Sequence, residues 1–170
     1  DFNPAKMLIN LNDWHYALIR RSHGRIVSTE QLAEALNVVQ NTHVVHNGID
    51  PSLWRMAVPA QPEDKPVRIM WAGGSTHSGD LKLVIDPIRR LIKRYPSKML
   101  FVFVGYLPEE FQDRNDSNRV AQAWQRWVQY APPVKIWEWP SYLEKAGCHI
   151  AIAPLVKHPF NESKSEIKVL

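Results

Sequence analysis

The segment from Val67 to Asp80 constrains the fold of this chain more than any other. An apolar run, Val67 to Ala72, stops at Gly73-Gly74, and a helical pattern begins a few polar residues later. Glycines let backbone N–H groups approach an oxyanion, and the start of a helix adds unpaired donors and the positive end of a dipole. The segment therefore predicts a strand, an anion-binding turn and a helix in succession.

Most of the chain repeats this alternation of apolar strand and amphipathic helix. Strands are predicted at 25–28, 42–46, 67–72, 99–104, 134–138 and 149–153. Helices are predicted at 5–22, 30–36, 79–94, 117–130, 140–146 and 162–170, the fourth with Val120, Trp124 and Trp127 facing inward. Continuous apolar strands between helices are typical of a parallel sheet covered on both faces. We therefore expect an α/β fold with a Rossmann-like parallel sheet, helices on both faces and a ligand at the carboxyl edge of the strands.

A turn is predicted at Asn47-Gly48, and residues 56–66 are expected to form an exposed connector. The helix predicted from 162 reaches Leu170 without a stop signal, so the last domain is expected to be incomplete.

Composition and charge limit the cellular location and the binding partners that we expect for this chain. Cys148 is the only cysteine, so no internal disulfide is expected, and its apolar neighbours predict a buried thiol. No apolar run approaches the ~20 residues that span a bilayer, and a cytoplasmic location, peripheral to the membrane at most, is expected. The net charge of +4 suits an anionic ligand, an anionic membrane surface or nucleic acid. Nucleic acid is not expected, because no recognition motif accompanies the charge.

The densest basic cluster falls on the helix predicted at 79–94 and its end. A solvated outer face is the simplest interpretation, and a contact with lipid headgroups is the alternative. The cluster comprises Arg89, Arg90, Lys93, Arg94 and Lys98.

A second anion-binding element is predicted between Phe160 and Lys168. Lys164, Ser165 and Lys168 fall at the start of the last predicted helix. Lysines near a helix N-terminus oppose the dipole, so an anion between them would explain their placement, with a solvated basic helix as the alternative. Two such elements suggest a ligand that carries a diphosphate.

The remaining polar and aromatic candidates each have two possible roles. His77 is either a core or capping histidine or a donor to a phosphate or sugar hydroxyl. Asp80 is expected near a helix start on electrostatic grounds, with ligand binding as the alternative. Trp137, Trp139 and Tyr142 follow a predicted strand and either stack on a nucleobase or pack in the core.

Several motifs occur in an order that resembles the nucleotide-sugar-binding half of GT-B glycosyltransferases. The closest type is glycosyltransferase family 4, in the branch with a Lys-Ser-x-x-Lys helix. The motifs are His46-Asn47-Gly48-Ile49-Asp50, the strand with its Gly-Gly loop, Val104-Gly105, Ile152-Ala153-Pro154-Leu155 and Phe160-Asn161-x-x-Lys164-Ser165-x-x-Lys168. The resemblance covers 46–170, and Val27 to Ala33 resembles the end of the N-terminal half of that family. It implies that residues 1–45 end the acceptor-side domain, that 46–66 connect the two domains and that 67–170 form the second, nucleotide-sugar-binding domain.

The resemblance implies transfer of a sugar from a nucleoside-diphosphate sugar to a glycan, lipid or protein, without metal or cofactor. The acceptor would lie on a missing N-terminal domain or a partner chain. The residues implied for the donor diphosphate and sugar are Gly73, Gly74, Ser75, His77, Asn161, Lys164, Ser165 and Lys168. Gly105, Trp139 and Tyr142 are implied beside the nucleobase, and no catalytic residue is assigned.

Two departures from the family keep other functions open. The Arg and Lys that many members carry after the first strand are replaced here by Gly74 and, approximately, Gly79. Of the usual Glu-x7-Glu pair, the first position falls at Ser163 and the second beyond Leu170. One alternative is a non-catalytic, degenerate GT-B module that binds carbohydrate or serves as a structural part of a larger assembly. Another is a nucleotide-binding α/β enzyme such as an epimerase of GT-B type.

Overall fold

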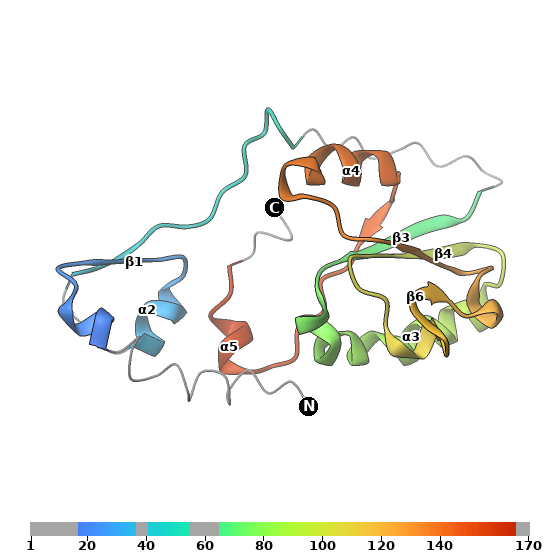
Figure 1. Cartoon of the computed structure of the whole chain (residues 1–170), viewed down its shortest axis with the longest axis horizontal. Helices are drawn as coiled ribbons and strands as arrows, with labels where there is room; N and C mark the ends of the chain where they lie inside the picture. The colour runs from blue at the N-terminus through green and yellow to red at the C-terminus, as the bar shows by residue number, and fades with distance from the viewer. Residues whose placement is uncertain (1–16, 37–40, 55–64, 166–170) are drawn as a thin grey trace. The chain divides into compact units, whose positions relative to one another are not determined.

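The computed structural model describes residues 17–36, 41–54 and 65–165, which form two compact units (Figure 1). The larger unit is Asp50–Val156, and the smaller unit combines the described residues of Asp1–Ile49 and Lys157–Leu170. The second predicted domain continued to residue 170, whereas the larger unit ends at Val156. Among the described residues, no helix has both the length and the apolar character needed to cross a membrane.

A four-stranded parallel sheet forms the centre of the larger unit, with strand order β7-β4-β3-β8. The strands are β3 (Val67–Ala72), β4 (Met99–Val104), β7 (Val128–Ala131) and β8 (Ile150–Ala151). β3 and β4 pair over their whole length. The α/β class and the parallel sheet are confirmed. β3 and β4 have the predicted bounds, whereas β8 is shorter than the strand predicted at 149–153.

Helices cover the two faces of this sheet, as predicted. α3 (Ser78–Arg94) lies against one face and α4 (Trp139–Ala146) against the other (Figure 1). Successive side chains of a strand point to opposite faces, so each strand contributes to two cores. The core beside α3 includes Ile69, Trp71, Phe101, Phe103, Leu81, Ile85, Ile88 and Ile92. The core beside α4 is built on Met70, Leu100, Val102 and Val104.

The helix predicted at 117–130 is wrong. The chain forms an antiparallel hairpin there, from β5 (Gln112–Asp113) to β6 (Asp116–Val120), then a 3-10 turn and β7. The carboxylates of Asp113 and Asp116 accept hydrogen bonds from the backbone N–H groups of Asn115 and Asn118. Such local bonds favour turns over helix. The apolar residues Val120, Trp124 and Trp127 do pack against the core as expected. Their spacing therefore predicted burial correctly and conformation wrongly.

The strand predicted at 134–138 is also wrong, because β7 takes its place beside β4. Pro132-Pro133 follows β7 directly and offers no N–H donors to extend a ladder. The apolar residues after it form a 3-10 turn, Ile136–Glu138, in which Ile136 and Trp137 are 77% and 72% exposed.

The smaller unit contains β1 (Arg25–Val27), α2 (Glu30–Leu36), β2 (Thr42–Val44) and α5 (Pro159–Glu162). β1 and β2 pair in parallel. β1 and α2 are confirmed, and β2 is shorter than predicted. Residues 17–21 are helical, and the rest of the helix predicted at 5–22 lies outside the described residues, as do 55–64 of the connector.

The turn predicted at Asn47-Gly48 occurs instead just after it, at 51–53. The Asp50 carboxylate accepts hydrogen bonds from the backbone N–H and the hydroxyl of Ser52, at 2.8 and 2.7 Å. These bonds to Ser52 lower the pKa of Asp50 from its ordinary value.

Candidate functional site

The turn after β3 brings together four of the predicted site residues: Gly73, Gly74, Ser75 and His77. The Gly73 N–H donates to the carbonyl of Val104 at 3.0 Å, so the turn leaves the sheet beside the end of β4. A single 3-10 turn, Ser75–His77, is closed by a hydrogen bond from the His77 N–H to Gly74 O, at 3.1 Å. α3 begins at the next residue. The predicted sequence of strand, turn and helix is therefore confirmed.

Gly105 holds the neighbouring strand end close to this turn. Its φ is +91°, and a Cβ at Gly105 would lie 2.6 Å from the carbonyl oxygen of Gly73. No side chain fits without moving backbone, so the fold itself requires this glycine. The nucleobase contact implied for Gly105 stays a prediction.

Gly74 and Gly79 have no such steric reason to be glycine. A Cβ added at either position would meet no atom within 4 Å, and the φ of Gly74, −93°, suits any residue. Gly79 lies in the first turn of α3, where glycine is less favourable than alanine. These two positions leave the backbone bare on either side of His77.

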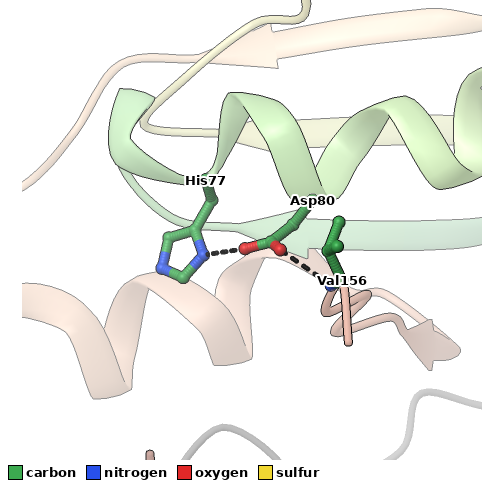
Figure 2. Close-up of polar contacts among 3 residues, drawn as sticks. All are labelled: His77, Asp80 and Val156. Carbon is green, nitrogen blue, oxygen red and sulfur yellow. Dashed lines mark hydrogen bonds and ion pairs between the residues drawn. The ribbon is translucent and has the colours of Figure 1, made fainter. Parts of the chain in front are cut away.

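His77 and Asp80 form a polar pair at the start of α3 (Figure 2). The distance from His77 Nδ1 to Asp80 Oδ2 is 2.9 Å, and their side chains are 16% and 8% exposed. The other oxygen of Asp80, Oδ1, accepts a hydrogen bond from the Val156 N–H at 2.8 Å. Asp80 thus joins the turn after β3 to the segment after β8.

Two effects place this pair. A carboxylate in the first turn of a helix interacts favourably with the dipole, as expected for Asp80. The ring of Trp71 at the end of β3 meets the His77 ring edge-on, with centroids 6.3 Å apart. The contact between His77 and Asp80 was missed from the sequence, although their spacing of three residues at a helix start could have indicated it.

The second predicted element has a different structure from the one expected. α5 ends at Glu162, so Lys164 and Ser165 follow this helix, and Lys168 lies outside the described residues. The ammonium of Lys164 lies 4.7 Å from the centroid of the Phe160 ring, and the Ser165 hydroxyl accepts a hydrogen bond from the Asn47 amide at 2.7 Å. The helix start predicted at 162 is therefore wrong, and residues 166–170, on which a helix after Ser165 depends, lie outside the described residues. The anion expected at Lys164 stays a prediction.

Asn161 lies in the last turn of α5, and its carbonyl oxygen accepts a hydrogen bond from the Lys164 N–H at 3.2 Å. Asn161, Lys164 and Ser165 belong to the smaller unit, whereas Gly73 to His77 belong to the larger one.

The aromatic residues predicted beside a nucleobase differ in burial. Trp139 and Tyr142 lie on α4, half-buried against the core of Val102 and Val104, with ring centroids 6.1 Å apart. Trp137 is exposed, and the Lys135 ammonium lies 5.5 Å from its ring centroid. Trp139 and Tyr142 therefore pack against the core with part of each ring exposed, and the nucleobase contact implied for them stays a prediction.

Cys148 packs against the same core but is half-buried, less than its apolar neighbours predicted. Burial raises the pKa of its thiol, and the nearby Arg68 guanidinium partly offsets this increase. The five basic residues from Arg89 to Lys98 are exposed, which agrees with a solvated outer face. In the part of the chain that the structure describes, no three His, Cys, Asp or Glu residues gather in a metal-binding arrangement.

Comparison of the chain with protein-family models, with curated proteins and with solved structures found no match.

Proposed function

We propose that this chain is the donor-binding part of a glycosyltransferase with a GT-B fold. The donor, a nucleoside-diphosphate sugar, binds at the carboxyl edge of β3, with its diphosphate over the turn from Gly73 to His77. One observation carries the proposal: this turn leaves the centre of a parallel sheet and enters a helix of 17 residues with bare backbone at Gly74 and Gly79.

The chemistry of glycosyl transfer makes specific demands on such a turn. Negative charge develops on the leaving diphosphate when the bond to the sugar breaks, and fixed donors at that point lower the barrier. Backbone N–H groups of the turn before α3 supply such donors without a protein cation. The N–H groups of His77 and Ser78 are not among them, because they donate to the carbonyls of Gly74 and Ser75. The exposed hydroxyls of Ser75 and Thr76 stand in the same turn and add two more.

The arrangement of the larger unit supports a Rossmann-like domain. Its parallel strands are covered on both faces, and ligands of such sheets bind outside the carboxyl ends of the strands. The order of motifs in the sequence adds the resemblance to GT-B enzymes of family 4.

A second function, a non-catalytic nucleotide-sugar-binding module, is favoured by a different observation. Glycine occupies positions 74 and 79, where the family often carries cations. Such a module binds the diphosphate but neither transfers nor hydrolyses the sugar. Release of the nucleoside diphosphate from a sugar donor distinguishes the two functions.

Binding of nucleotides to the whole chain tests the proposed site. UDP, GDP, ADP and dTDP are each titrated by calorimetry, with the monophosphates as reference ligands. At least one diphosphate should bind more tightly than its monophosphate, and at 100 times its Kd it should stabilise the fold by about 2.7 kcal/mol.

Gly74→Val should weaken this binding by tenfold or more, because an isopropyl group fills the bare position. Gly48→Val is the matched control, since a Cβ at Gly48 also meets nothing within 4 Å. Equal affinity for mono- and diphosphates, or no binding of any nucleotide by folded protein, would reject the proposed function.

A further inference from the structure

Six exposed cations gather around the end of α3. We propose that they form a docking surface, the basic surface, by which the protein binds to a membrane of anionic phospholipids. Binding there does not depend on the nucleotide site, because the basic surface lies at the other edge of the sheet. The six residues are Arg89, Arg90, Lys93, Arg94, Lys98 and Arg126.

Contacts between two turns make the basic surface continuous. The Trp127 indole N–H donates a hydrogen bond to the carbonyl of Pro96 at 2.6 Å. The Arg126 guanidinium donates to the hydroxyl of Ser97 at 3.4 Å, across 29 residues of sequence. These bonds hold the turn before β7 against the turn between α3 and β4. Arg126 therefore lies beside the cations that α3 and the turn after it contribute.

The basic surface lies at the edge of the sheet opposite the candidate nucleotide site. The carbonyl of Lys98 accepts a hydrogen bond from the Val67 N–H at 2.8 Å, and the carbonyl of Trp127 accepts one from Phe101 at 2.8 Å. These bonds place the surface beside the amino ends of the parallel strands. The turn from Gly73 to His77 follows the carboxyl end of β3 instead. A membrane bound at the basic surface thus does not cover that turn.

The charge along the two segments is of one sign. No Asp or Glu occurs at positions 87–108 or 117–137 of the sequence. Among the described residues, Arg89 alone of the six cations forms an ion pair, with Asp86 at 3.4 Å. Exposed pairs of this kind contribute little to stability. Most of the positive charge of the basic surface is therefore available to a partner.

Repulsion within α3 favours an anionic partner. Arg89 and Lys93 are four residues apart on the helix, and like charges at this spacing destabilise it. Arg90 and Arg94 form a second such pair. The helix dipole favours Lys93 and Arg94 in the last turn, but the effect falls off within one turn and does not explain Arg89 and Arg90. An array of phosphates against the basic surface offsets this repulsion.

Aromatic rings hold three of the guanidinium groups in place. The distance from the guanidinium carbon to the ring centroid is 5.9 Å for Arg89 and Trp124, 5.3 Å for Arg94 and Tyr95, and 5.7 Å for Arg126 and Trp127. An arginine that stacks on a ring keeps the planar fork of N–H groups that binds a phosphate through two hydrogen bonds. Trp and Tyr rings are enriched at the interface between a membrane and water, because one end is apolar and the other is polar. Both features suit a layer of phospholipid headgroups.

The same contacts favour lipid over single-stranded nucleic acid. Proteins that bind single strands stack successive bases on aromatic rings. Trp124 and Trp127 pack against the hydrophobic core, and each also lies under a guanidinium group. A base would have to displace one of these contacts in order to stack. Phosphate groups need only the exposed guanidinium and ammonium groups, which a headgroup layer contacts directly.

Sedimentation of the whole chain with lipid vesicles tests the proposal. The vesicles contain phosphatidylcholine alone, or phosphatidylcholine with one third phosphatidylglycerol, in about 0.1 M salt, where charges more than about 10 Å apart are largely screened. The parent should bind the mixed vesicles but not the neutral ones, and additional salt should release it. The assay contains no nucleotide, so its result is independent of the proposed function.

Two double variants with the same net charge locate the surface that binds. The first, Lys93→Gln with Lys98→Gln, removes two charges from the basic surface. The matched control, Lys82→Gln with Lys145→Gln, removes two exposed charges from the start of α3 and from α4. Each basic residue near an anionic membrane strengthens binding by roughly fivefold, so the first variant should bind the mixed vesicles about 25-fold more weakly than the parent. The control should stay within about twofold of the parent, because its changes lie outside the surface.

Binding that requires the anionic lipid and is weakened only in the first variant supports the proposal. If the first variant does not fold, Arg90→Gln replaces it, with an expected loss of about fivefold. Equal losses in the two double variants would show that net charge alone attracts the membrane, which overturns the docking surface. Parent protein that does not bind the mixed vesicles overturns it directly.

A single-stranded DNA oligonucleotide provides the competing ligand. It is added to vesicle-bound parent protein at a phosphate concentration equal to that of the phosphatidylglycerol. The protein should stay on the vesicles. Its release would reject the lipid in favour of nucleic acid as the partner of the basic surface.

Discussion

The hydroxyl of Thr29 donates a hydrogen bond to the carbonyl oxygen of Ser163, at 2.9 Å and across 134 residues of sequence. The same hydroxyl oxygen accepts the Leu32 N–H at 3.1 Å and caps α2, and Thr29 is 5% exposed. A second hydrogen bond, from the Asn47 amide, reaches the hydroxyl of Ser165, two residues after Ser163. These contacts explain why the residues after Val156 group with the first part of the chain.

Thr29→Val removes both hydrogen bonds of this side chain while keeping its volume. Loss of an N-cap alone costs about 0.5–2 kcal/mol, and the buried Ser163 bond adds to it. We expect a loss of roughly 1–3 kcal/mol in the free energy of unfolding of the smaller unit. Thr29→Ser retains the hydroxyl and should lose far less. Urea unfolding followed by circular dichroism measures both, and equal stability of Thr29→Val and the parent would contradict the cap.

Gly105→Ala should destabilise the larger unit. The positive φ strains any other residue, and the new Cβ would lie 2.6 Å from the Gly73 carbonyl. Residues forced into such backbone conformations cost on the order of 1–3 kcal/mol, before the clash is counted. Thermal unfolding of the variant measures the loss, and a melting temperature equal to that of the parent would show that the two strand ends separate easily.

Gly79→Ala should have the opposite effect on stability. The position lies in the first turn of α3, and a methyl group there meets no atom within 4 Å. A Gly→Ala change at a compatible site stabilises by about 0.4–1 kcal/mol, chiefly through the unfolded state. The variant should therefore melt higher than the parent. It should also bind the diphosphate more weakly, because the methyl group covers backbone that the ligand approaches. If Gly79→Ala bound the diphosphate more tightly than the parent, the ligand would not lie over the backbone at Gly79.

The sequence predicted those elements whose apolar pattern is long and regular. β3, β4 and α3 each contain such a pattern, and their bounds agree with the structure to within one residue. The prediction for residues 112–131 was wrong. Val120, Trp124 and Trp127 have the spacing of a helix face, but they lie on a hairpin and a turn. Hydrogen bonds to the carboxylates of Asp113 and Asp116 stabilise that hairpin. Local hydrogen bonds determine the conformation of this segment, and the spacing of apolar residues carries no information about such bonds.

The candidate site was predictable in part for a similar reason. The turn from Gly73 to His77 is local and follows from strand, glycine and helix signals in one stretch. The hydrogen bond from the Val156 N–H to Asp80 joins positions 76 residues apart. Its donor is a backbone N–H group, which nearly every residue type has, so the sequence does not indicate this bond. The helix start predicted at 162 was wrong, since α5 begins at Pro159 and ends at Glu162.

A comparison of Trp139→Ala with Trp137→Ala should distinguish a role in core packing from a role in ligand contact. Trp139 is half-buried against the core of Met70 and Leu100, so Trp139→Ala should cost roughly 1–3 kcal/mol, less than a fully buried tryptophan. Trp137 is exposed, so Trp137→Ala should leave stability within about 0.5 kcal/mol of the parent. Chemical denaturation of both variants measures these changes. A stable Trp139→Ala that loses nucleotide affinity would show that Trp139 contacts the ligand as well as the core.

Cys148 should make the larger unit less stable at alkaline pH. Burial raises the pKa of its thiol above the ordinary value of 9.0, while the nearby Arg68 guanidinium opposes part of the shift. Below the unfolded pKa the thiol is protonated in both states, and its stabilising contribution is fully present. Above that pH the unfolded chain releases the proton first, so stability falls as pH rises through the folded pKa.

Denaturant unfolding of the parent and of Cys148→Ala, at several pH values between 7 and about 10.5, measures this contribution. The difference in free energy of unfolding between the two proteins should be constant below the unfolded pKa of the thiol and should shift in favour of the variant above it. Alkylation by iodoacetamide gives an independent measurement, because only the thiolate reacts: the native protein should react more slowly than the unfolded chain at pH 8.5. A difference that does not change with pH, together with equal alkylation rates, would show that Cys148 is solvated in the native protein.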